Sequence, residues 1–367
     1  MENRQSWSSR LTFILAAVGS AVGLGNAWRF PGLASKHGGG AFLLVYLIAM
    51  LVFGVPLLMM EISIGRKLKK GAAPAMRGIN KKFEPIGWAA TANAFVIVCY
   101  YAVVFAWVIL MVFMSFKFAG MTGDTVAASN LFADTIETTW KVEDYGIPLI
   151  MIIPFLLAWG SIFYSIRNSA QSIGKVVKYI VFLPLIFLAI MAVKGLTMPG
   201  AMDGIQKLFV PDFAALKDPA IWIDAVGQVF YSLSVMMAIM FAYGSYLKDD
   251  SNIAVDAMII AFCDIGISIL AGVAMFSTMG GTGMLGNMTD SGIATAFIVY
   301  PQAIVSLSNS GVFNAIFGAV FYLCLVTLAI DSAFSIVEGV SASVADRFKL
   351  NPRKTTRNIV IVAAVIS

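Results

Sequence analysis

The sequence predicts an all-α polytopic membrane protein, and two observations carry that prediction. The chain is 59% hydrophobic and only 12% charged, with a mean hydropathy of +0.86. Soluble domains typically have about a quarter of their residues charged. The apolar residues also fall in blocks of about 20, the length that crosses the hydrocarbon core of a bilayer as a helix. Together these observations exclude an ordinary soluble enzyme or binding domain.

Successive blocks of this kind predict eight spans. They are expected at 11–32, 40–60, 86–116, 147–165, 173–194, 220–246, 255–279 and 311–345. A ninth is expected to begin at Asn358, and the chain stops inside it at Ser367. The first span is expected to stay in the mature protein, because it is rich in glycine and lacks a cleavage site followed by a soluble body. The three cysteines lie within predicted spans, where a disulfide framework is not expected.

The distribution of cations predicts the orientation of the chain. Lys and Arg gather before the first span, in the run 66–82 after the second, and after the fourth, sixth and eighth spans. The loop 118–146 on the other side is acidic. Because cytoplasmic loops are enriched in Lys and Arg, we expect a multi-pass protein of a cell membrane with a cytoplasmic N-terminus. The basic run lacks interleaved aromatic residues, so no nucleic-acid partner is expected.

Glycines near the middle of the first span predict a break in its helix. Gly19, Gly23 and Gly25 lie within seven residues, and each interior glycine costs a helix up to about 1 kcal/mol relative to alanine. Glycines also permit close helix packing, but Asn26 and Arg29 follow at once, and a cation inside a span indicates a functional role. A break survives in lipid only where it is buried or lines a cavity. The freed carbonyls are then available to bind ions.

The sixth span carries polar side chains at membrane depth. Gln228, Tyr231, Ser232 and Ser234 lie near its centre. Interrupted helices at matching positions of two inverted halves are typical of transporters with a binding site at the membrane midplane. We therefore expect one transmembrane domain, 1–367, with a first repeat over about 11–194 and a second, truncated repeat from about 220.

Two carboxylates lie inside later spans. Asp264 is in the seventh, and Asp331 stands beside Ser332 in the eighth. Hard cations such as sodium prefer oxygen ligands, by the same logic that governs calcium. Asp331, Ser332 and the carbonyls of a broken first span are therefore a candidate sodium site. A buried ion pair or a protonated acid remains an alternative for each carboxylate.

Three segments resemble the signatures of the neurotransmitter:sodium symporter family. They are WSSRLTFILAAVGSAVGLGNAWRFPGLASKHGGG from Trp7 to Gly40, GQVFYSLS in the sixth span and LAIDSAF in the eighth. The resemblance covers essentially the whole chain. It implies two inverted five-helix repeats with broken helices 1 and 6, and a symporter that carries its substrate with two sodium ions.

The resemblance also implies roles for individual residues. The first sodium ion is expected at the carbonyl of Ala21 and the side chains of Asn26, Ser232 and Asp264. The second is expected at the carbonyls of Gly19, Val22 and Leu328 and the side chains of Asp331 and Ser332. Substrate is expected to contact Ser20, Ala21, Gly23, Gly25, Ile97, Tyr101, Tyr231, Ser234 and Met237. The outer gate is expected to involve Arg29, Gln228, Tyr101 and Tyr231, and the inner gate Arg4 with Asp346, supported by Trp7, Ser245 and Tyr246. The family's acidic outer partner lies on a tenth helix.

Gly23 indicates the class of substrate. Family members that carry monoamines have aspartate at this position, whereas carriers of α-amino acids have glycine. Tyr231, Met237 and Ile97 make the side-chain pocket apolar, so the resemblance implies a neutral hydrophobic or aromatic amino acid. Met236 and Ala238 replace glycines of the family and are expected to fill space in the site.

Asp264 bears on chloride. Many members have asparagine there, and animal members bind chloride near the positions of Tyr46, Gln228, Ser232 and Ser268. A carboxylate among these groups supplies the negative charge itself. Chloride is therefore not expected to be required.

Other functions remain open at this point. A non-transporting amino-acid sensor on the same fold is the chief alternative, whereas broken helices suit occlusion better than the open pore of a channel. An enzyme is not expected, because the single histidine, His37, lies in a predicted loop and no nucleophile and base pairing stands out. Short tails and the lack of a loop disulfide indicate a bacterial inner membrane. We expect a monomer or a weak homodimer.

Overall fold

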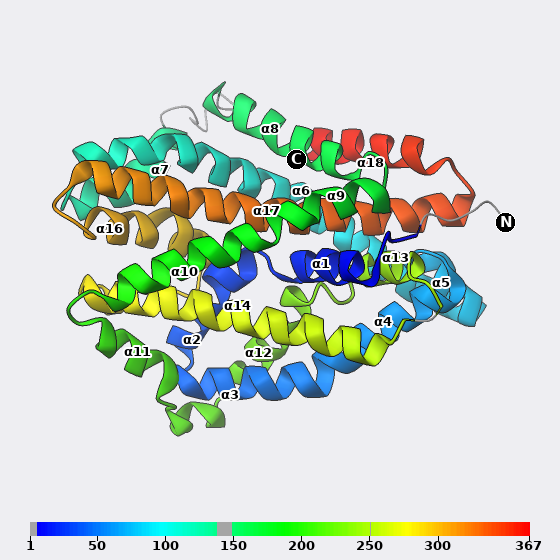
Figure 1. The fold of residues 1–367 in the computed structure, drawn as a ribbon, viewed down its shortest axis with the longest axis horizontal. Helices are drawn as coiled ribbons and strands as arrows, with labels where there is room; N and C mark the ends of the chain where they lie inside the picture. The colour runs from blue at the N-terminus through cyan, green and yellow to red at the C-terminus, as the bar shows by residue number, and fades with distance from the viewer. Residues whose placement is uncertain (1–5, 138–148, 250) are drawn as a thin grey trace.

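The computed structural model describes residues 6–137, 149–249 and 251–367, and the regular structure in these ranges is helical (Figure 1). The helices are α1 (Arg10–Ala21), α2 (Phe30–Lys36), α3 (Gly40–Ala49), α4 (Val55–Leu68), α5 (Ala72–Ile79), α6 (Glu84–Met114), α7 (Thr125–Glu137), α8 (Leu149–Ile166), α9 (Ala170–Ile180), α10 (Phe182–Leu196), α11 (Ala201–Phe209), α12 (Pro219–Ser232), α13 (Ile239–Ser245), α14 (Ile253–Gly281), α15 (Gly292–Ala294), α16 (Tyr300–Val305), α17 (Gly311–Phe348) and α18 (Pro352–Ile366). One isolated bridge joins Gly39 to Pro211.

These helices confirm the membrane-spanning architecture. Within the described ranges, six continuous helical spans are long and apolar enough to cross a bilayer: Gly40–Leu68, Lys81–Gly120, Leu149–Ile166, Ala170–Leu196, Ile253–Gly281 and Gly311–Phe348. The helices Arg10–Ala21 and Gly25–Lys36 form a further span that is bent by 49°. The predicted span 220–246 consists of α12 and α13, with residues 233–238 between them.

Local capping sets several helix ends. Ser9 Oγ accepts the N–H of Thr12 at 3.2 Å and begins α1. The last helix starts at Pro352 rather than at Asn358, so the expected boundary was wrong by more than a turn. Asn351 accepts the N–H of Lys354 at 3.2 Å, and proline is favoured at the first helical position, so the polar residues before Asn358 are helical too.

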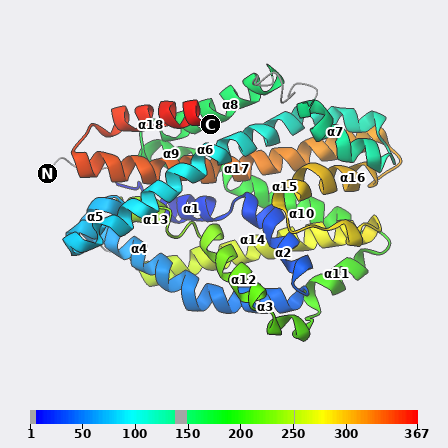
Figure 2. The ribbon, with the colours of Figure 1, turned by 180° about the vertical axis from the view of Figure 1, so that it is seen from behind.

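The first span runs through the interior of the molecule. Both views show α1 between α17 and α14 (Figures 1 and 2), and it contacts both helices as well as α9 and α13. Its second half, 16–21, is buried on every side. α5 and α13 lie at one end of the molecule, and α11 and α16 lie at the opposite end (Figure 1). The break that follows α1 therefore lies deep between the two ends.

Candidate functional site

The first span breaks where the glycines predicted a break. Val22 leaves the helix with extended backbone angles (φ −83°, ψ 98°), and a π-helical turn, Gly25–Arg29, resumes the span. Asn26 Oδ1 accepts the N–H of Gly23 at 2.9 Å and so satisfies one of the freed donors. The carbonyls at the end of α1 are left without their helical partners, which makes them available as ligands.

The sixth span breaks between α12 and α13, and three residues there have left-handed backbone angles. They are Ser234 (φ 54°), Met236 (φ 62°) and Ala238 (φ 61°). Hydrogen bonds from other parts of the chain hold this segment: Ser234 Oγ donates to the carbonyl of Ser20 at 3.0 Å, and the N–H of Met236 donates to Glu61 Oε1 at 2.8 Å. The two breaks are thus joined directly to each other.

A cavity lies between the two breaks. Every residue expected to contact substrate lines it, together with further residues that share this wall: Ser20, Ala21, Gly23, Leu24, Gly25, Asn26, Ile97, Tyr101, Tyr231, Ser232, Ser234, Met237, Ser332 and Ile336. The volume of the cavity that the centre of a water molecule can reach is about 20 Å³, which is enough for one ordered water. An amino-acid side chain therefore enters only if lining side chains move, and the flexible Met237 is suited to do so.

Met236 and Ala238 do not line the cavity, so the expectation that they fill it was wrong. The side chain of Met236 is 37% exposed, and Ala238 packs with Ala72 and Ala75 of α5. The left-handed angles of both residues turn their side chains away from the wall that Ser234 and Met237 form.

Asp264 forms the centre of a buried polar cluster. Its carboxylate accepts from Asn26 Nδ2 at 2.8 Å, from Ser232 Oγ at 2.6 Å and from Tyr46 OH at 2.9 Å. Ser268, one turn further along α14, accepts from Asn26 Nδ2 at 2.8 Å. The structure thus brings together the three side chains expected at the first sodium site with three of the four positions associated with chloride, Ser232 belonging to both sets. Gln228 lies apart and donates to the carbonyl of Gly25 at 3.3 Å.

Asp331 lies against the first break from the side of α17. Its side chain is buried, and Oδ1 has no hydrogen-bond partner among the described residues. A Cβ atom on Gly19 would lie 2.7 Å from Asp331 Oδ2, and one on Gly23 would lie 2.5 Å from Ser332 Oγ. Ser332 Oγ is 3.5 Å from the carbonyl of Leu328. Only glycine leaves room for the carboxylate and the hydroxyl to face the backbone of the broken span.

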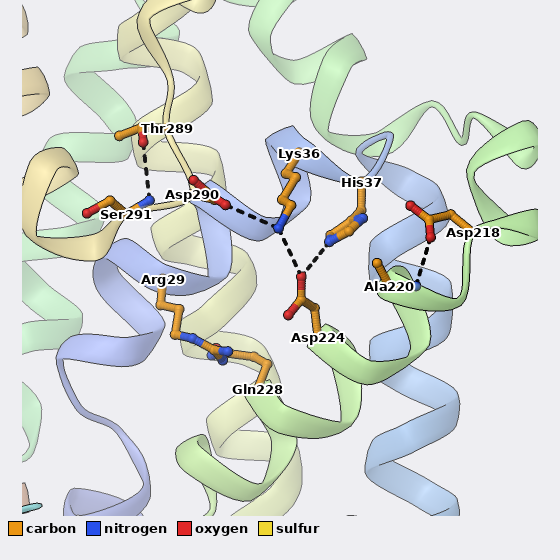
Figure 3. A network of polar contacts seen from close by, with 10 residues as sticks. All are labelled: Arg29, Lys36, His37, Asp218, Ala220, Asp224, Gln228, Thr289, Asp290 and Ser291. Atoms are coloured by element: carbon orange, nitrogen blue, oxygen red, sulfur yellow. Dashed lines mark hydrogen bonds and ion pairs between the residues drawn. The ribbon is translucent and has the colours of Figure 1, made fainter.

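Three of the four residues expected at the outer gate lie together. Arg29 Nη1 donates to Gln228 Oε1 at 2.7 Å, and its guanidinium lies 6.0 Å from the centre of the Tyr231 ring. Figure 3 shows Arg29 of the first span and Gln228 of α12 side by side. Tyr101 borders the cavity, and its hydroxyl has no hydrogen-bond partner among the described residues.

At the other end, Trp7 ties the start of the chain to α13. Its indole Nε1 donates to the carbonyl of Tyr243 at 2.9 Å, and its N–H donates to the carbonyl of Tyr246 at 3.1 Å. Ser245 Oγ donates within the same helix, to Ala242, at 2.5 Å. Asp346 accepts the N–H of Gly71 at 2.7 Å. Arg4 lies outside the described residues, and with it the expected pair with Asp346.

Sequence reasoning missed three buried carboxylates, of which Asp256 in the first turn of α14 pairs with Arg10 at 2.7 Å. Glu61 in α4 holds the sixth-span break, and Glu338 in α17 accepts from Tyr246 OH at 2.5 Å and from Ser169 Oγ. Both interrupt long apolar runs, which is the signal that marked Asp264 and Asp331. The same criterion applied to every span finds them.

Similarities to known proteins agree with this arrangement. The model of the Sodium:neurotransmitter symporter family matches residues 4–125 and 134–367. A relative described as an uncharacterized sodium-dependent transporter of Methanocaldococcus jannaschii is 36% identical over 99% of this chain and 74% of its own length. The human sodium- and chloride-dependent GABA transporter 2 is 31% identical over 99% of this chain and 65% of its own length. The chain thus spans about two thirds to three quarters of the length of these relatives.

A solved structure has the same fold. The crystal structure of MhsT in complex with L-phenylalanine superposes with a TM-score of 0.85 at 29% identity, over 99% of this chain and 79% of that chain. Family and neighbour are transporters rather than enzymes. With broken spans, a cavity between them and a family match along nearly the whole sequence, this chain belongs to the sodium:neurotransmitter symporter family.

Proposed function

We propose that this protein is a sodium-coupled symporter that imports a neutral hydrophobic or aromatic amino acid by alternating access and does not need chloride. One observation carries the proposal: Asp331 is 2% exposed, and its Oδ1 faces the interior without a hydrogen-bond partner in the described ranges. A buried carboxylate without compensation costs several kcal/mol. A sodium ion between Asp331, Ser332 and the carbonyls of Gly19, Val22 and Leu328 removes that cost.

The cluster around Asp264 supports a second ion. Asp264 and Ser232 offer carboxylate and hydroxyl oxygens within one hydrogen-bonded group, which Asn26 joins through its Nδ2. The amide oxygen of Asn26, which accepts the N–H of Gly23, and the carbonyl of Ala21 are further oxygens of residues on the same cavity wall. These are the hard oxygen ligands that sodium takes. The ion would lie next to the cavity, where a substrate carboxylate can complete its coordination.

The cavity wall supports an α-amino acid with an apolar side chain. Tyr101 OH offers a hydrogen bond to a carboxylate, and Gly23 leaves no acidic side chain to pair a lone amine. Ile97, Met237 and Ile336 provide the apolar part of the wall. MhsT is described in complex with L-phenylalanine, whereas the mammalian relatives are named for GABA and taurine. The apolar wall favours a substrate of the first kind.

Two sodium ions provide enough driving force for strong accumulation. Each charge that crosses the membrane gains about 2.3 kcal/mol at 100 mV, and a tenfold gradient adds about 1.4 kcal/mol per ion. The sum, about 7 kcal/mol, sustains an accumulation of roughly 10⁵. In this proposal the broken first and sixth spans rock against the remaining helices. The two inverted repeats cover about 11–194 and the chain from about 220, and the N-terminus lies in the cytoplasm.

Asp264 supports chloride independence. Its carboxylate already accepts hydrogen bonds from Tyr46, Ser232 and Asn26, which are donors that would otherwise surround an anion. The protein itself therefore supplies the negative charge at this place, through the side chain of Asp264. The human relatives at 31% identity are named as chloride-dependent, so the presence of this carboxylate is the feature to test.

Transport by the full-length protein in liposomes tests the proposal. Uptake of labelled leucine, phenylalanine, tyrosine and tryptophan is measured with and without an inward sodium gradient, in chloride and in gluconate. Sodium-driven accumulation that is equal in both anions supports the symporter. Saturable, sodium-dependent binding without accumulation would replace it with an amino-acid sensor.

Asp331→Asn is predicted to lower the apparent sodium affinity at least tenfold, because the amide keeps the volume of the side chain but removes the negative charge that attracts the sodium ion. A tenfold change corresponds to about 1.4 kcal/mol. Titration of sodium at saturating substrate measures it, in chloride and in gluconate. Chloride should not rescue this variant. An unchanged sodium midpoint would refute the second sodium site.

Asp264→Asn is predicted to make transport depend on chloride or to abolish it, since a fixed negative charge is removed from a buried cluster. The matched variant Asp264→Asn/Ser268→Asp returns a carboxylate one turn along α14, where Ser268 already contacts Asn26 and Tyr46. It should restore uptake in gluconate. Full activity of the single variant in gluconate would show that Asp264 does not substitute for chloride.

A further inference from the structure

A group of charged residues lies at the end of the molecule opposite α5 and α13, outside the cavity and its gates. Lys36, the last residue of α2, has its Nζ 3.3 Å from Asp224 Oδ2 of α12 and 3.1 Å from Asp290 Oδ2 (Figure 3). Asp290 belongs to the segment that joins α14 to α16; residues 282–294 of it are called the covering segment here. One ammonium group thus bridges three separate parts of the chain.

The covering segment is seated on the outer half of the first span. A Cβ atom on Gly32 would lie 2.5 Å from the carbonyl oxygen of Thr289, and one on Gly292 would lie 2.6 Å from the ring of Trp28. Glycine at both positions permits this close approach. The segment therefore rests on the half-helix whose inner end lines the cavity.

Two polar contacts, two helical turns apart on the first span, connect it with α12. Arg29 bonds to Gln228 at 2.7 Å, and Lys36 pairs with Asp224, one turn before Gln228. His37 fixes Asp224 from the side: its Nε2 lies 2.7 Å from Asp224 Oδ2, and its ring is 5% exposed and stacks on Phe42. Asp224 thus belongs to the paired half-helices, and Lys36 extends from that pair to the covering segment.

We propose that Lys36 is a latch: its ammonium, held by Asp224 on the pair of broken helices, binds Asp290 and so keeps the covering segment closed over the outer end of the site. This inference rests on the proposed function. The Lys36 and Asp290 side chains are 43% and 51% exposed, whereas Asp224 is 25% exposed. An exposed ion pair is weak and easily broken, which suits a contact that must open in every transport cycle. The pair with Asp224, more buried and supported by His37, stays with the helices.

The proposal predicts the effect of each charge. Asp290→Asn should speed dissociation of bound substrate about two- to fivefold, the change that an exposed ion pair provides. Lys36→Gln should accelerate dissociation at least as much, because it removes the pairs with both Asp290 and Asp224. The double variant should be no faster than Lys36→Gln alone, because that change already removes the contact with Asp290. Asp218→Asn is the matched control. Asp218 caps α12 at the same end through the N–H of Ala220 at 2.9 Å, and asparagine caps a helix equally well.

Dissociation of labelled phenylalanine from the full-length protein in detergent provides the first measurement, at fixed sodium. Raising the ionic strength with potassium gluconate from about 0.1 M to about 1 M shortens the Debye length from about 10 Å to about 3 Å. The wild-type rate should then approach that of Asp290→Asn, whose own rate should stay nearly constant. Equal rates for wild type and Asp290→Asn, or the same acceleration in Asp218→Asn, would overturn the latch.

A second measurement does not depend on transport or on the identity of the substrate. Spin labels at Asn287→Cys of the covering segment and Phe213→Cys before α12, both exposed positions, report the distance between the two parts. Cys263, which is exposed, is first replaced by serine; Cys99 and Cys324 are buried. Asp290→Asn should increase the population of longer distances, and Asp218→Asn should not. A shift without uptake would keep the latch and reject the symporter, whereas uptake without a shift in any variant would reject the latch alone.

Discussion

The two breaks in the membrane spans are built in different ways. In the first span, glycines stand where other groups approach: a Cβ atom would meet Asp331 at Gly19, Ser332 at Gly23 and the Tyr231 ring at Gly25, each within 2.7 Å. None of these glycines has a left-handed backbone angle. In the sixth span the reverse holds. Ser234, Met236 and Ala238 have left-handed angles, and no glycine is present between α12 and α13.

The difference indicates what each break requires. The first is a matter of space, because carboxylate, hydroxyl and ring must come close to the backbone. The second is a matter of backbone conformation, because left-handed angles cost a residue that has a side chain roughly 1–2 kcal/mol. External hydrogen bonds, from Met236 to Glu61 and from Ser234 to Ser20, hold it in place. Substitutions at the two breaks should therefore have effects of different size and sign.

The largest effect is expected at the first break, from Gly25→Ala. The added methyl group would lie 2.5 Å from a carbon of the Tyr231 ring, which cannot rotate away as a hydroxyl can. Overpacking of this kind costs about 1–3 kcal/mol, so we expect sodium-dependent substrate binding to weaken roughly 5- to 150-fold. Equilibrium binding of labelled phenylalanine measures it.

Gly160→Ala is the control for that substitution. Gly160 lies in α8, and a Cβ atom there would meet nothing within 4 Å. This variant should bind substrate as the wild type does. If both glycine variants bind normally, the first break is not limited by space, and the comparison between the two breaks fails.

Much of the fold and of the cavity was predictable from the sequence. Long apolar runs reveal spans whatever their packing, and a glycine, asparagine or carboxylate inside such a run stands out against it. For that reason Ser20, Tyr101, Ser234 and their neighbours were expected at the cavity and do line it. Leu24 and Ile336 also line the cavity and were not expected there, because neither residue stands out in an apolar run.

What escaped prediction depends on partners distant in the sequence. Lys36, Asp224 and Asp290 are ordinary charged residues near the ends of spans, and only the folded chain places the Lys36 ammonium within 3.3 Å of both carboxylates. The direction of Met236 also escaped, because it follows from a backbone angle that sequence patterns assign to glycine. His37 does lie in the turn after α2, as expected, but its burial and its contact with Asp224 were not predicted.

An intermediate effect is expected from Glu61→Leu, which removes the acceptor for the Met236 N–H. A donor left without a partner costs about 1–3 kcal/mol, and since Met236 is partly exposed we expect about 1.5 kcal/mol of lost stability. Thermal unfolding in detergent measures it. Glu61→Gln keeps the accepting oxygen and should lose less than half as much. Equal losses in both variants would indicate that charge, rather than the hydrogen bond, holds the second break.

The smallest effect, and one of opposite sign, is expected from Met236→Gly. Glycine removes the left-handed penalty of about 1–2 kcal/mol. It also stabilises the unfolded state by about 0.4–1 kcal/mol of chain entropy, so the net gain is about 0.8 kcal/mol at the middle of both ranges. Ala238→Gly should gain less stability, because the methyl group packs on Ala72 and Ala75.

Lys349→Gly is the control, since Lys349 has a similar angle (φ 54°) at the end of α17, far from the cavity. Both Met236→Gly and Lys349→Gly should raise the unfolding temperature slightly, but only Met236→Gly should change the uptake rate, because only that strain is stored at a break that must rearrange. A destabilised Met236→Gly would show that the second break is not strained.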